Sequence, residues 1–306
     1  MKPRRVRVGL LALCLLTVIA APLLRASADT GLLTVHFIDV GQGDSCWLQL
    51  PNGDDVLVDG GKPQAGPTVV AYLQDHEVHD IEFMILSHPH EDHIGGLIDV
   101  IESFPVSQVI LSRDSCSTNV CDEFFALVAQ KGMPLVYVST GDTFAWGAVT
   151  ASVVNPTQNL YSSWLSAVDP EMMAELLKSD TNNNSVVIHV SYGNTDLLLT
   201  GDIEERAESD ILARGEMIGA EILKVAHHGS NTSSTVDFLT AVSPSEAIIS
   251  ADPSVYGHPD EEALQRLANV GATIWRTDED GSIIVTTDGN QQCKYSYPGD
   301  SLSHHC

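Results

Sequence analysis

The stretch S-H-P-H-E-D-H-I-G-G at residues 87–96 follows an apolar run, Ile81 to Leu86, that has the composition of a buried strand. A loop at the end of a strand can turn several side chains toward one point. Imidazole and carboxylate groups are ligands of zinc, manganese and iron, so this spacing predicts a metal site. The potential ligands lie within six residues and are His88, His90, Asp92 and His93.

Two later segments have the same form. L-L-L-T-G-D at residues 197–202 places Asp202 just past an apolar strand, and L-K-V-A-H-H-G-S at residues 223–230 places His227 and His228 just past another. Each segment alone is weak evidence for a metal site, since a histidine at a strand end is usually an ordinary loop residue. Together they supply ligands from several strand ends of one layered sheet, which is the arrangement that predicts a two-metal site.

The rest of the chain alternates short apolar strands with helical stretches. Three strand-like runs open it, separated by G-Q-G-D at residues 41–44 and P-N-G-D at residues 51–54. Later strands alternate with helical patterns at 121–131, 204–214 and 261–269, which predicts a mixed α/β layered domain over residues 29–306. The segment Thr157 to Thr181 interrupts this pattern, and we interpret it either as a mobile cover over the site or, with slight preference, as a surface excursion.

The chain is strongly acidic, with 41 acidic and 15 basic residues among its 306. Four bases, an apolar run at residues 8–24 and A-S-A at residues 26–28 predict a secretory signal peptide over residues 1–28. The alternative is a retained membrane anchor, because the run is about as long as a short spanning helix. Cleavage before Asp29 removes five bases and no acid, leaving a net charge of −31 and no stable membrane anchor. We therefore expect a secreted or extracytoplasmic protein without a broad basic surface for nucleic acid.

Five cysteines lie outside the predicted signal peptide. Cys116 and Cys121 bracket a short polar segment, and Cys293 and Cys306 bracket the C-terminal tail. Export would allow each of these pairs to close a small loop. Cys46 is left over within a predicted strand, and we interpret it as a small buried apolar residue.

Further motifs narrow the interpretation: V-H-F-I-D-V-G-Q-G-D-S, V-L-V-D-G-G, N-N-N-S-V-V-I, L-K-V-A-H-H-G-S-N and Y-G-H-P. With residues 87–96 they resemble the metallo-β-lactamase fold and, more narrowly, the hydrolase domain of the ComEC competence family. The resemblance runs from about Leu32 to about Asp288. It implies an α/β fold in which a four-layer αββα sandwich carries two divalent metal ions at one edge. Zn²⁺ is the preferred ion, and Mn²⁺ is the alternative.

The resemblance also implies roles for the ligands. His88 and His90 would hold the first metal, whereas Asp92 and His93 would hold the second. Asp202 would bridge the two ions. Asp92 is therefore a catalytic candidate as well as a ligand.

The remaining positions leave alternatives open. Asp59 matches an acid that usually orients the metal loop rather than ligating, and His228 is preferred to His227 as the last ligand from the resemblance to phosphocholine esterases of this fold. Many members of the fold place a third histidine on the first metal shortly before the bridging acid, and this chain has an Asn-rich stretch there instead. Either Asp180 or an asparagine such as Asn184 completes that shell, or the stretch is a polar turn that only hydrogen-bonds the loop.

Two divalent ions a few ångströms apart activate water and stabilise the charge of an in-line displacement, which suits phosphodiesters. We therefore expect an exported hydrolase of a small phosphodiester or a short single-stranded nucleic acid, with nuclease activity implied by the resemblance. His258 in Y-G-H-P is the second catalytic candidate, for substrate contact. Ser230, near a predicted helix start, and Lys224 are further candidates for contacts to phosphate oxygens.

Two other functions are possible for this sequence. A lactamase or lactonase of the same fold is the weaker alternative, because competence-type motifs surround the ligands. A noncatalytic secreted binding module with a structural metal site is supported only by the missing third histidine. The set formed by Asp92, His93, Asp202 and His228 argues against it, since a structural zinc site is normally closed by four protein ligands without a substrate position.

Overall fold

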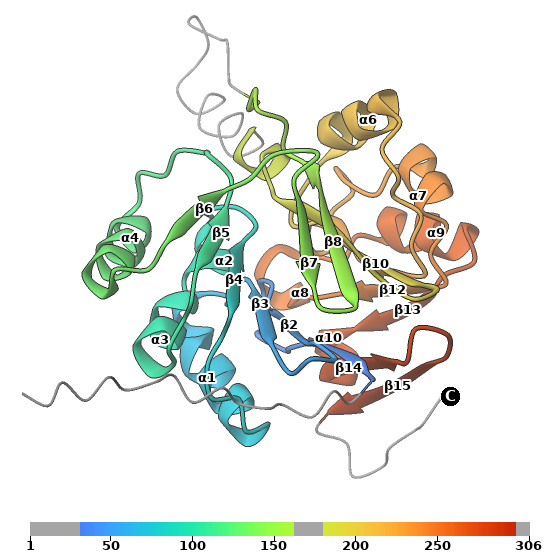
Figure 1. The fold of residues 1–306 in the computed structure, drawn as a ribbon. Helices are drawn as coiled ribbons and strands as arrows, with labels where there is room; N and C mark the ends of the chain where they lie inside the picture. The colour runs from blue at the N-terminus through green and yellow to red at the C-terminus, as the bar shows by residue number, and fades with distance from the viewer. Residues whose placement is uncertain (1–30, 162–179, 298–306) are drawn as a thin grey trace, which may run out of the picture.

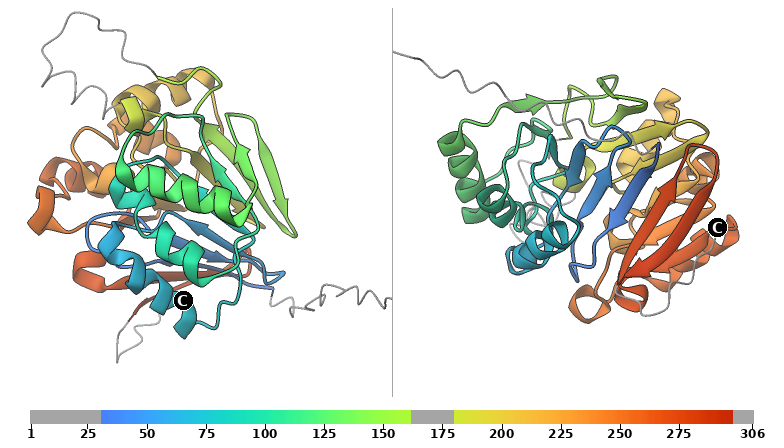
Figure 2. Two further views of the ribbon diagram at one scale, coloured as in Figure 1. Left: turned by 90° about the vertical axis from the view of Figure 1, so that its left-hand side faces the viewer. Right: turned by 60° about the horizontal axis from the view of Figure 1, so that its bottom comes forward.

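The computed structural model describes residues 31–161 and 180–297 (Figure 1). Two β-sheets pack face to face, and helices cover both outer faces (Figure 1 and Figure 2). The predicted four-layer αββα sandwich is therefore confirmed.

The first sheet has eight strands in the order β15-β14-β1-β2-β3-β4-β5-β6. Their bounds are β1 Leu33–Phe37, β2 Cys46–Gln49, β3 Asp55–Val58, β4 Phe83–Leu86, β5 Val109–Leu111, β6 Leu135–Tyr137, β14 Ser282–Thr287 and β15 Gln292–Tyr297. The second sheet has seven strands in the order β13-β12-β11-β10-β9-β8-β7. Their bounds are β7 Thr143–Trp146, β8 Val149–Asn155, β9 Val187–Tyr192, β10 Thr195–Leu199, β11 Ile222–Lys224, β12 Glu246–Ile249 and β13 Thr273–Arg276.

Side chains that alternate along the strands build the core between the sheets. In β1, Val35 and Phe37 are buried against the second sheet, where residues such as Val190 and Leu197 meet them in one cluster. His36, between the two, points the other way and bonds to Tyr72 of helix α1 (Gly66–Asp75). The strands are thus buried on both faces, as in other layered α/β proteins.

Amphipathic helices supply the outer layers. In α1, Val69, Tyr72 and Leu73 recur at helical spacing and are buried on the first sheet, together with residues of α3 (Leu97–Ser103) and α4 (Asn119–Lys131). The second sheet is covered by α6 (Glu205–Arg214), α7 (Val236–Val242) and α9 (Glu261–Asn269), with Phe238 and Leu239 of α7 fully buried.

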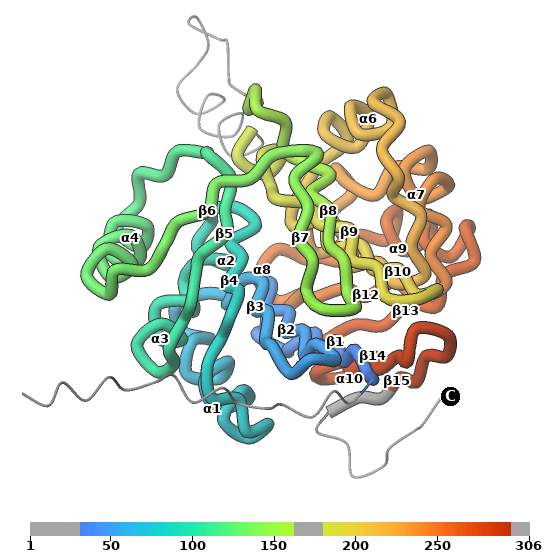
Figure 3. The backbone as a smooth tube through the Cα atoms, in the orientation of Figure 1, coloured from blue at the N-terminus to red at the C-terminus, as the bar shows by residue number. Residues whose placement is uncertain are grey.

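Parallel strands of both sheets end at one edge of the sandwich. In the first sheet β3, β4, β5 and β6 are parallel neighbours, and in the second sheet β10, β11, β12 and β13 are. The loops after β4, β10 and β11 therefore leave the same edge and bring segments far apart in the sequence together (Figure 3). These are the loops that carry the predicted ligands.

Several elements were not predicted from the sequence, including β7, β13, β14, β15, α3 and α7. β14 joins the first sheet by pairing with β1, with Val285 opposite Val35. In Figure 1 this C-terminal strand lies beside the N-terminal one. A contact between such distant residues has no local signature in the sequence.

Cys116 and Cys121 form the predicted disulfide, and Cys46 is free and buried in β2. Cys306 lies outside the described residues, so its predicted pairing with Cys293 stays a prediction. The predicted signal peptide and residues 162–179 of the Thr157–Thr181 segment also lie outside them. Within the described ranges, no helix has the length and apolar character needed to cross a membrane.

Candidate metal centre

The loop after β4 carries the first group of histidines to the sheet edge. His90 is the N-terminal cap of the short helix α2 (Glu91–Ile94), which contains His93. Gly96 lets this loop pack directly on the loop after β3, because a Cβ atom at Gly96 would lie 1.9 Å from the carbonyl oxygen of Gly60. The amide of Gly60 in turn donates to the carbonyl oxygen of His93 at 2.8 Å. The two loops thus support each other directly beneath the histidines.

His93 lies between two buried carboxylates. Its Nδ1 atom is 2.8 Å from Oδ2 of Asp59, and its Nε2 atom is 3.2 Å from Oδ2 of Asp202. Asp59, which follows β3 with a φ of 60°, also accepts hydrogen bonds from the amide and hydroxyl of Ser87. Because Asp59 favours a proton on Nδ1, the lone pair of Nε2 is directed toward Asp202.

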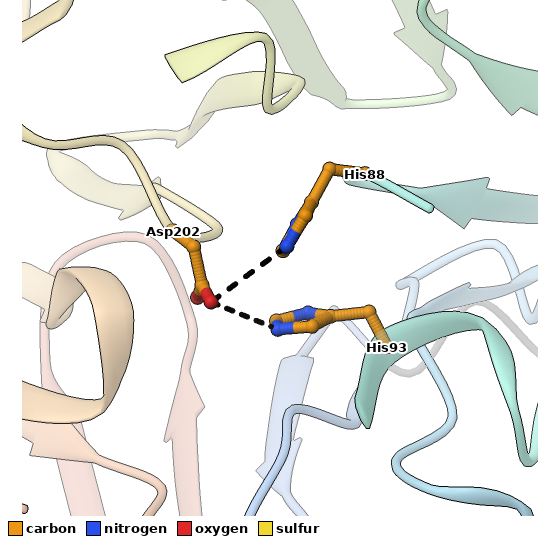
Figure 4. Close-up of side chains that lie close together, drawn as sticks. All are labelled: His88, His93 and Asp202. Atoms are coloured by element: carbon orange, nitrogen blue, oxygen red, sulfur yellow. Dashed lines mark hydrogen bonds and ion pairs between the residues drawn. The ribbon is translucent and has the colours of Figure 1, made fainter. Parts of the chain in front are cut away.

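His88 completes a converging group with His93 and Asp202 (Figure 4). Its Nε2 atom is 3.7 Å from Oδ2 of Asp202 and 2.9 Å from Nδ1 of His90. Two ring nitrogens this close together either share one proton or direct both lone pairs at a common cation. Two of the four predicted ligands of the metal loop therefore face each other.

The loop after β11 aims His228 at the same point. In the short 3₁₀ helix η2 (Ala226–Gly229), His227 and His228 have φ values of 50° and 55°, a left-handed conformation that is unfavourable for residues other than glycine. Nδ1 of His228 is 2.8 Å from the carbonyl oxygen of Ser250. Its Nε2 atom lies 3.4 Å from Oδ2 of Asp202 and 3.6 Å from Oδ2 of Asp92. The geometry favours His228 over His227 as the inward-facing histidine.

The donor atoms in this cluster fit a divalent ion. Among the described residues, Oδ1 of Asp202 and Nε2 of His228 are buried without a hydrogen-bond partner, which is costly unless something else satisfies them. Ligand atoms within 4.8 Å of one another form four overlapping groups, two of which contain Asp44. The other two are His88, His93 and Asp202, and Asp92, His93 and His228. Nitrogen and carboxylate donors without thiolates suit zinc or manganese.

The charges of the cluster lead to the same conclusion. Burial opposes the charged form of His228, but the carboxylates of Asp202 and Asp44 outweigh it and raise the pKa of this histidine to about 10. Burial is likewise outweighed at His93, where Asp202 and Asp59 raise the pKa well above its ordinary value. Protons therefore balance the buried carboxylates in the ion-free cluster, and a divalent ion would displace them.

Asp44, between β1 and β2, is a member of the cluster that the sequence analysis missed. Its buried Oδ1 atom is 2.8 Å from Nζ of Lys224 and 3.3 Å from Nδ1 of His228. The side chain of Lys224 is only 4% exposed, so the prediction that it contacts phosphate oxygens is wrong. Asp44 follows Gly43 two residues before β2, so an acid beside glycine next to a strand, the pattern that also marks Asp59, could have revealed it.

The Asn-rich stretch does not enter the cluster. Asp180 pairs with Arg206 at 3.0 Å, and Asn184 accepts a hydrogen bond from the amide of Tyr161. Asn183 accepts from two amides at the start of α6. The described part of the stretch therefore forms a polar turn whose side chains contact α6, Tyr161 and, from Nδ2 of Asn182 at 3.5 Å, Nε2 of His227.

His258 lies beyond His227, with 6.0 Å between the two ring centroids. Its Nδ1 atom is 3.0 Å from Oδ2 of Asp260, which leaves Nε2 for another contact, and burial lowers the pKa of His258. Ser230 follows η2 and bonds to the hydroxyl of Thr232, while α7 begins further along the chain. No helix starts at Ser230, so the predicted anion site at a helix start there is wrong.

Known proteins resemble this chain in sequence and in fold. A family model described as "Metallo-beta-lactamase superfamily" matches residues 38–252. ComE operon protein 3 of Bacillus subtilis (strain 168) is 27% identical over 267 residues, which cover 81% of this chain and 32% of the relative. Competence protein ComA of Neisseria gonorrhoeae is 27% identical over 80% of this chain and 31% of its own length. Recombination protein 2 of Haemophilus influenzae is 27% identical over 82% of this chain and 28% of its own length.

The resemblance to the ComEC family is thus confirmed, and the chain spans about a third of the length of these curated relatives. Among solved structures, the metallo-beta-lactamase fold protein YhfI from Bacillus subtilis has a TM-score of 0.50 at 12% identity, covering 80% of this chain and 95% of that one. A mutant of the β-hydroxylase CmlA has a TM-score of 0.51 at 12% identity, covering 80% of this chain and 52% of that one. At such identities the likeness concerns the fold alone.

Proposed function

The chain belongs to the metallo-β-lactamase superfamily, and from that premise we propose that it is a metal-dependent hydrolase that cleaves phosphodiester bonds. The observation that carries this proposal is the position of one carboxylate among three imidazoles. Oδ2 of Asp202 lies 3.2 Å, 3.4 Å and 3.7 Å from the Nε2 atoms of His93, His228 and His88. A two-metal site requires a carboxylate that both ions can share, within reach of ligands from several loops.

We assign the ligands to two ions, with Zn²⁺ preferred and Mn²⁺ as the alternative. Nε2 of His88 and Nδ1 of His90 would hold the first ion. The second ion would be held by Asp92, His93 and His228, and Asp202 would be shared.

When bound, the two ions would supply an activated water and positive charge for the phosphate oxygens. The chain's own contribution is to orient the ligands. Asp59 accepts from Nδ1 of His93, and the Ser250 carbonyl accepts from Nδ1 of His228, so in each ring Nε2 is the nitrogen that would give up its proton to bind an ion. Asp260 orients His258 in the same way by accepting from its Nδ1, and Nε2 of His258 would accept a hydrogen bond from the substrate.

A phosphodiester is the substrate class best supported. The names of the relatives refer to competence and recombination, which favours nucleic acid over lactams or lactones. The net charge of −26 for the whole chain disfavours long duplex DNA, so a short single strand or a small diester is preferred. The predicted signal peptide and the Cys116–Cys121 disulfide support export.

The test is a turnover assay of the purified protein loaded with Zn²⁺ or Mn²⁺. The substrates are a small activated phosphodiester, a single-stranded oligonucleotide, a lactam and a lactone. We expect metal-dependent cleavage of the first two, abolished in Asp92→Ala and His228→Ala and retained in His189→Ala, which removes a histidine of β9 that bonds to a backbone carbonyl. Circular dichroism checks that the variants are folded.

Two results would contradict the proposal. Rapid lactam turnover without phosphodiester cleavage under either metal would place the chemistry in another branch of the superfamily. Stoichiometric metal binding with no turnover of any substrate would instead favour the noncatalytic binding module.

A further inference from the structure

A polar cavity of about 430 Å³ opens at the edge of the sandwich that carries the metal cluster. Arg113 and Ser139 line it from the loops after β5 and β6, and Tyr137 is the last residue of β6. Thr157 and Gln158 line it from the loop after β8, in the second sheet. The cavity therefore lies at the mouth between the two sheets.

The strand order places this cavity beside the metal loop. β4, which leads into His88, is the parallel neighbour of β5, and β5 is the parallel neighbour of β6. Adjacent strands are about 4.8 Å apart, so the cavity begins within roughly 10 Å of the loop. The segment after Arg113 also contacts the loop, because the sulfurs of Cys116 and Cys121 each lie 3.6 Å from the carbonyl oxygen of Pro89. A substrate held at the cluster can thus reach the cavity with its neighbouring unit.

Arg113 is an available cation in a strongly acidic chain. It is exposed and forms no ion pair with any other described residue, whereas Arg206, Arg214 and Arg276 each pair with a carboxylate. Among the described residues that line the cavity, it is the only basic one. A guanidinium group presents a fork of N–H donors that matches the oxygens of a phosphate.

Tyr137 gives the cavity an aromatic surface. The guanidinium carbon of Arg113 lies 4.8 Å from the centroid of the Tyr137 ring, and Tyr137 is 43% exposed. Asp142 also lines the cavity, and its Oδ2 atom accepts a hydrogen bond from the amide of Ser139 at 2.8 Å. Unpaired bases stack on aromatic rings and on arginine planes, and this stacking does not depend strongly on sequence.

A second pair of this kind lies on the other side of the metal loop. Nζ of Lys62 is 5.4 Å from the ring centroid of Tyr256, which is 64% exposed. Lys62 follows β3, the neighbour of β4 on the side away from β5. Hydrogen bonds from Ser254 and, to a smaller degree, the charge of Lys62 lower the pKa of Asp252. Tyr256 ends the short helix α8 (Pro253–Tyr256), with its ring centroid 6.4 Å from that of His258. The metal loop therefore lies between two cation–aromatic pairs.

We propose that the Arg113–Tyr137 cavity is a binding subsite for the nucleotide next to the scissile phosphodiester of a single-stranded substrate. The neighbouring phosphate binds the guanidinium of Arg113, and the base stacks on the layer formed by Arg113 and Tyr137. This inference rests on the proposed function and extends it from a small diester to an oligonucleotide. A duplex is excluded from the subsite because its bases are already stacked on each other.

The experiment measures binding and turnover separately in the full chain. Fluorescence anisotropy with a labelled single-stranded oligodeoxynucleotide gives Kd, and a small activated phosphodiester that does not reach the cavity reports the metal site. We expect Arg113→Gln and Tyr137→Leu to raise Kd about tenfold, whereas Tyr137→Phe retains the wild-type Kd. Cleavage of the small diester should stay within about twofold of wild type in all three variants.

Lys131→Gln is the matched control, because it removes one exposed positive charge at the end of α4, away from the cavity. Unchanged oligonucleotide binding in Arg113→Gln and Tyr137→Leu would overturn the subsite and leave the proposed function intact. Equal weakening by Lys131→Gln would overturn it as well, since the effect would then be one of overall charge. A third outcome is that the wild-type protein cleaves no diester while Arg113→Gln and Tyr137→Leu still weaken oligonucleotide binding. That outcome would support the subsite and contradict the proposed function.

Discussion

Replacing Asp59 with asparagine should weaken one of the two metal sites and spare the other. Oδ2 of Asp59 accepts hydrogen bonds from Nδ1 of His93 and from the hydroxyl of Ser87. The amide of Ser87 donates to Oδ1 of Asp59 and cannot give up its proton. An asparagine oxygen that keeps this bond turns the NH₂ group toward His93, which then keeps its contact only if its proton moves from Nδ1 to Nε2. A protonated Nε2 cannot bind a metal. Asparagine tolerates the φ of 60° at this position, so the backbone should be retained.

The expected loss can be bounded. Removing the group that orients a metal-binding histidine costs about 10- to 100-fold in metal affinity, which corresponds to about 1.4–2.7 kcal/mol. Asp59 is only 1% exposed, so water cannot easily replace its carboxylate. Asp59 reaches the first site only indirectly, through the hydroxyl of Ser87, which lies 3.1 Å from Nδ1 of His88. The affinity of the first site should therefore change by less than about threefold.

The assay is a stepwise Zn²⁺ titration of the metal-free protein against a chelating indicator. In the wild type we expect two affinities, the tighter one at the second site, because Asp92, His93, Asp202 and His228 form a full ligand set. In Asp59→Asn the two affinities should converge. The control is Asp55→Asn, which alters a buried aspartate of β3 that binds the indole of Trp47 instead. Two unchanged affinities, or two equal losses, would refute the reasoning.

Three further outcomes are expected. Asp202→Ala should weaken both metal affinities together in the same titration, and two tight ions retained would show that Asp202 does not bridge. Lys224→Met should lower the free energy of unfolding by about 3–5 kcal/mol in urea denaturation, because it removes the nearer of the two cationic groups beside the buried carboxylate of Asp44 and leaves only His228. A loss below about 1 kcal/mol would contradict that pairing. Raising salt from low to moderate should not weaken oligonucleotide binding steeply, because added ions screen the repulsion from an acidic chain; a steep loss in a salt series of Kd would instead indicate a basic groove.

Much of the cluster could be predicted because its signals are local. His88, His90, Asp92 and His93 are close together in the sequence and follow an apolar strand. Asp202 follows another strand in the same manner. Carboxyl ends of parallel strands share one edge of a sheet, so recognising the strands is enough to bring these residues together without knowing the packing of the sheets.

Other parts depended on contacts that have no local signature. A lysine near a strand end is usually solvated, yet Lys224 points into the sandwich because Asp44 from the opposite sheet meets it there. The group that orients His228 is the backbone carbonyl of Ser250, which any residue would supply. Asp180 could be a ligand by its residue type, and only the position of Arg206 assigns it to a surface ion pair.

The cluster lies across the seam of the sandwich, since His88 and His93 come from the first sheet and Asp202 and His228 from the second. His93 and Asp202 are 109 positions apart in the chain, so an ion bound to both would act as a cross-link that closes a very long loop. Separating the two sheets would then require release of the ion, and the melting temperature should rise with its free concentration. The supply of metal in the surroundings would therefore set how long the folded protein survives, in addition to whether it can act.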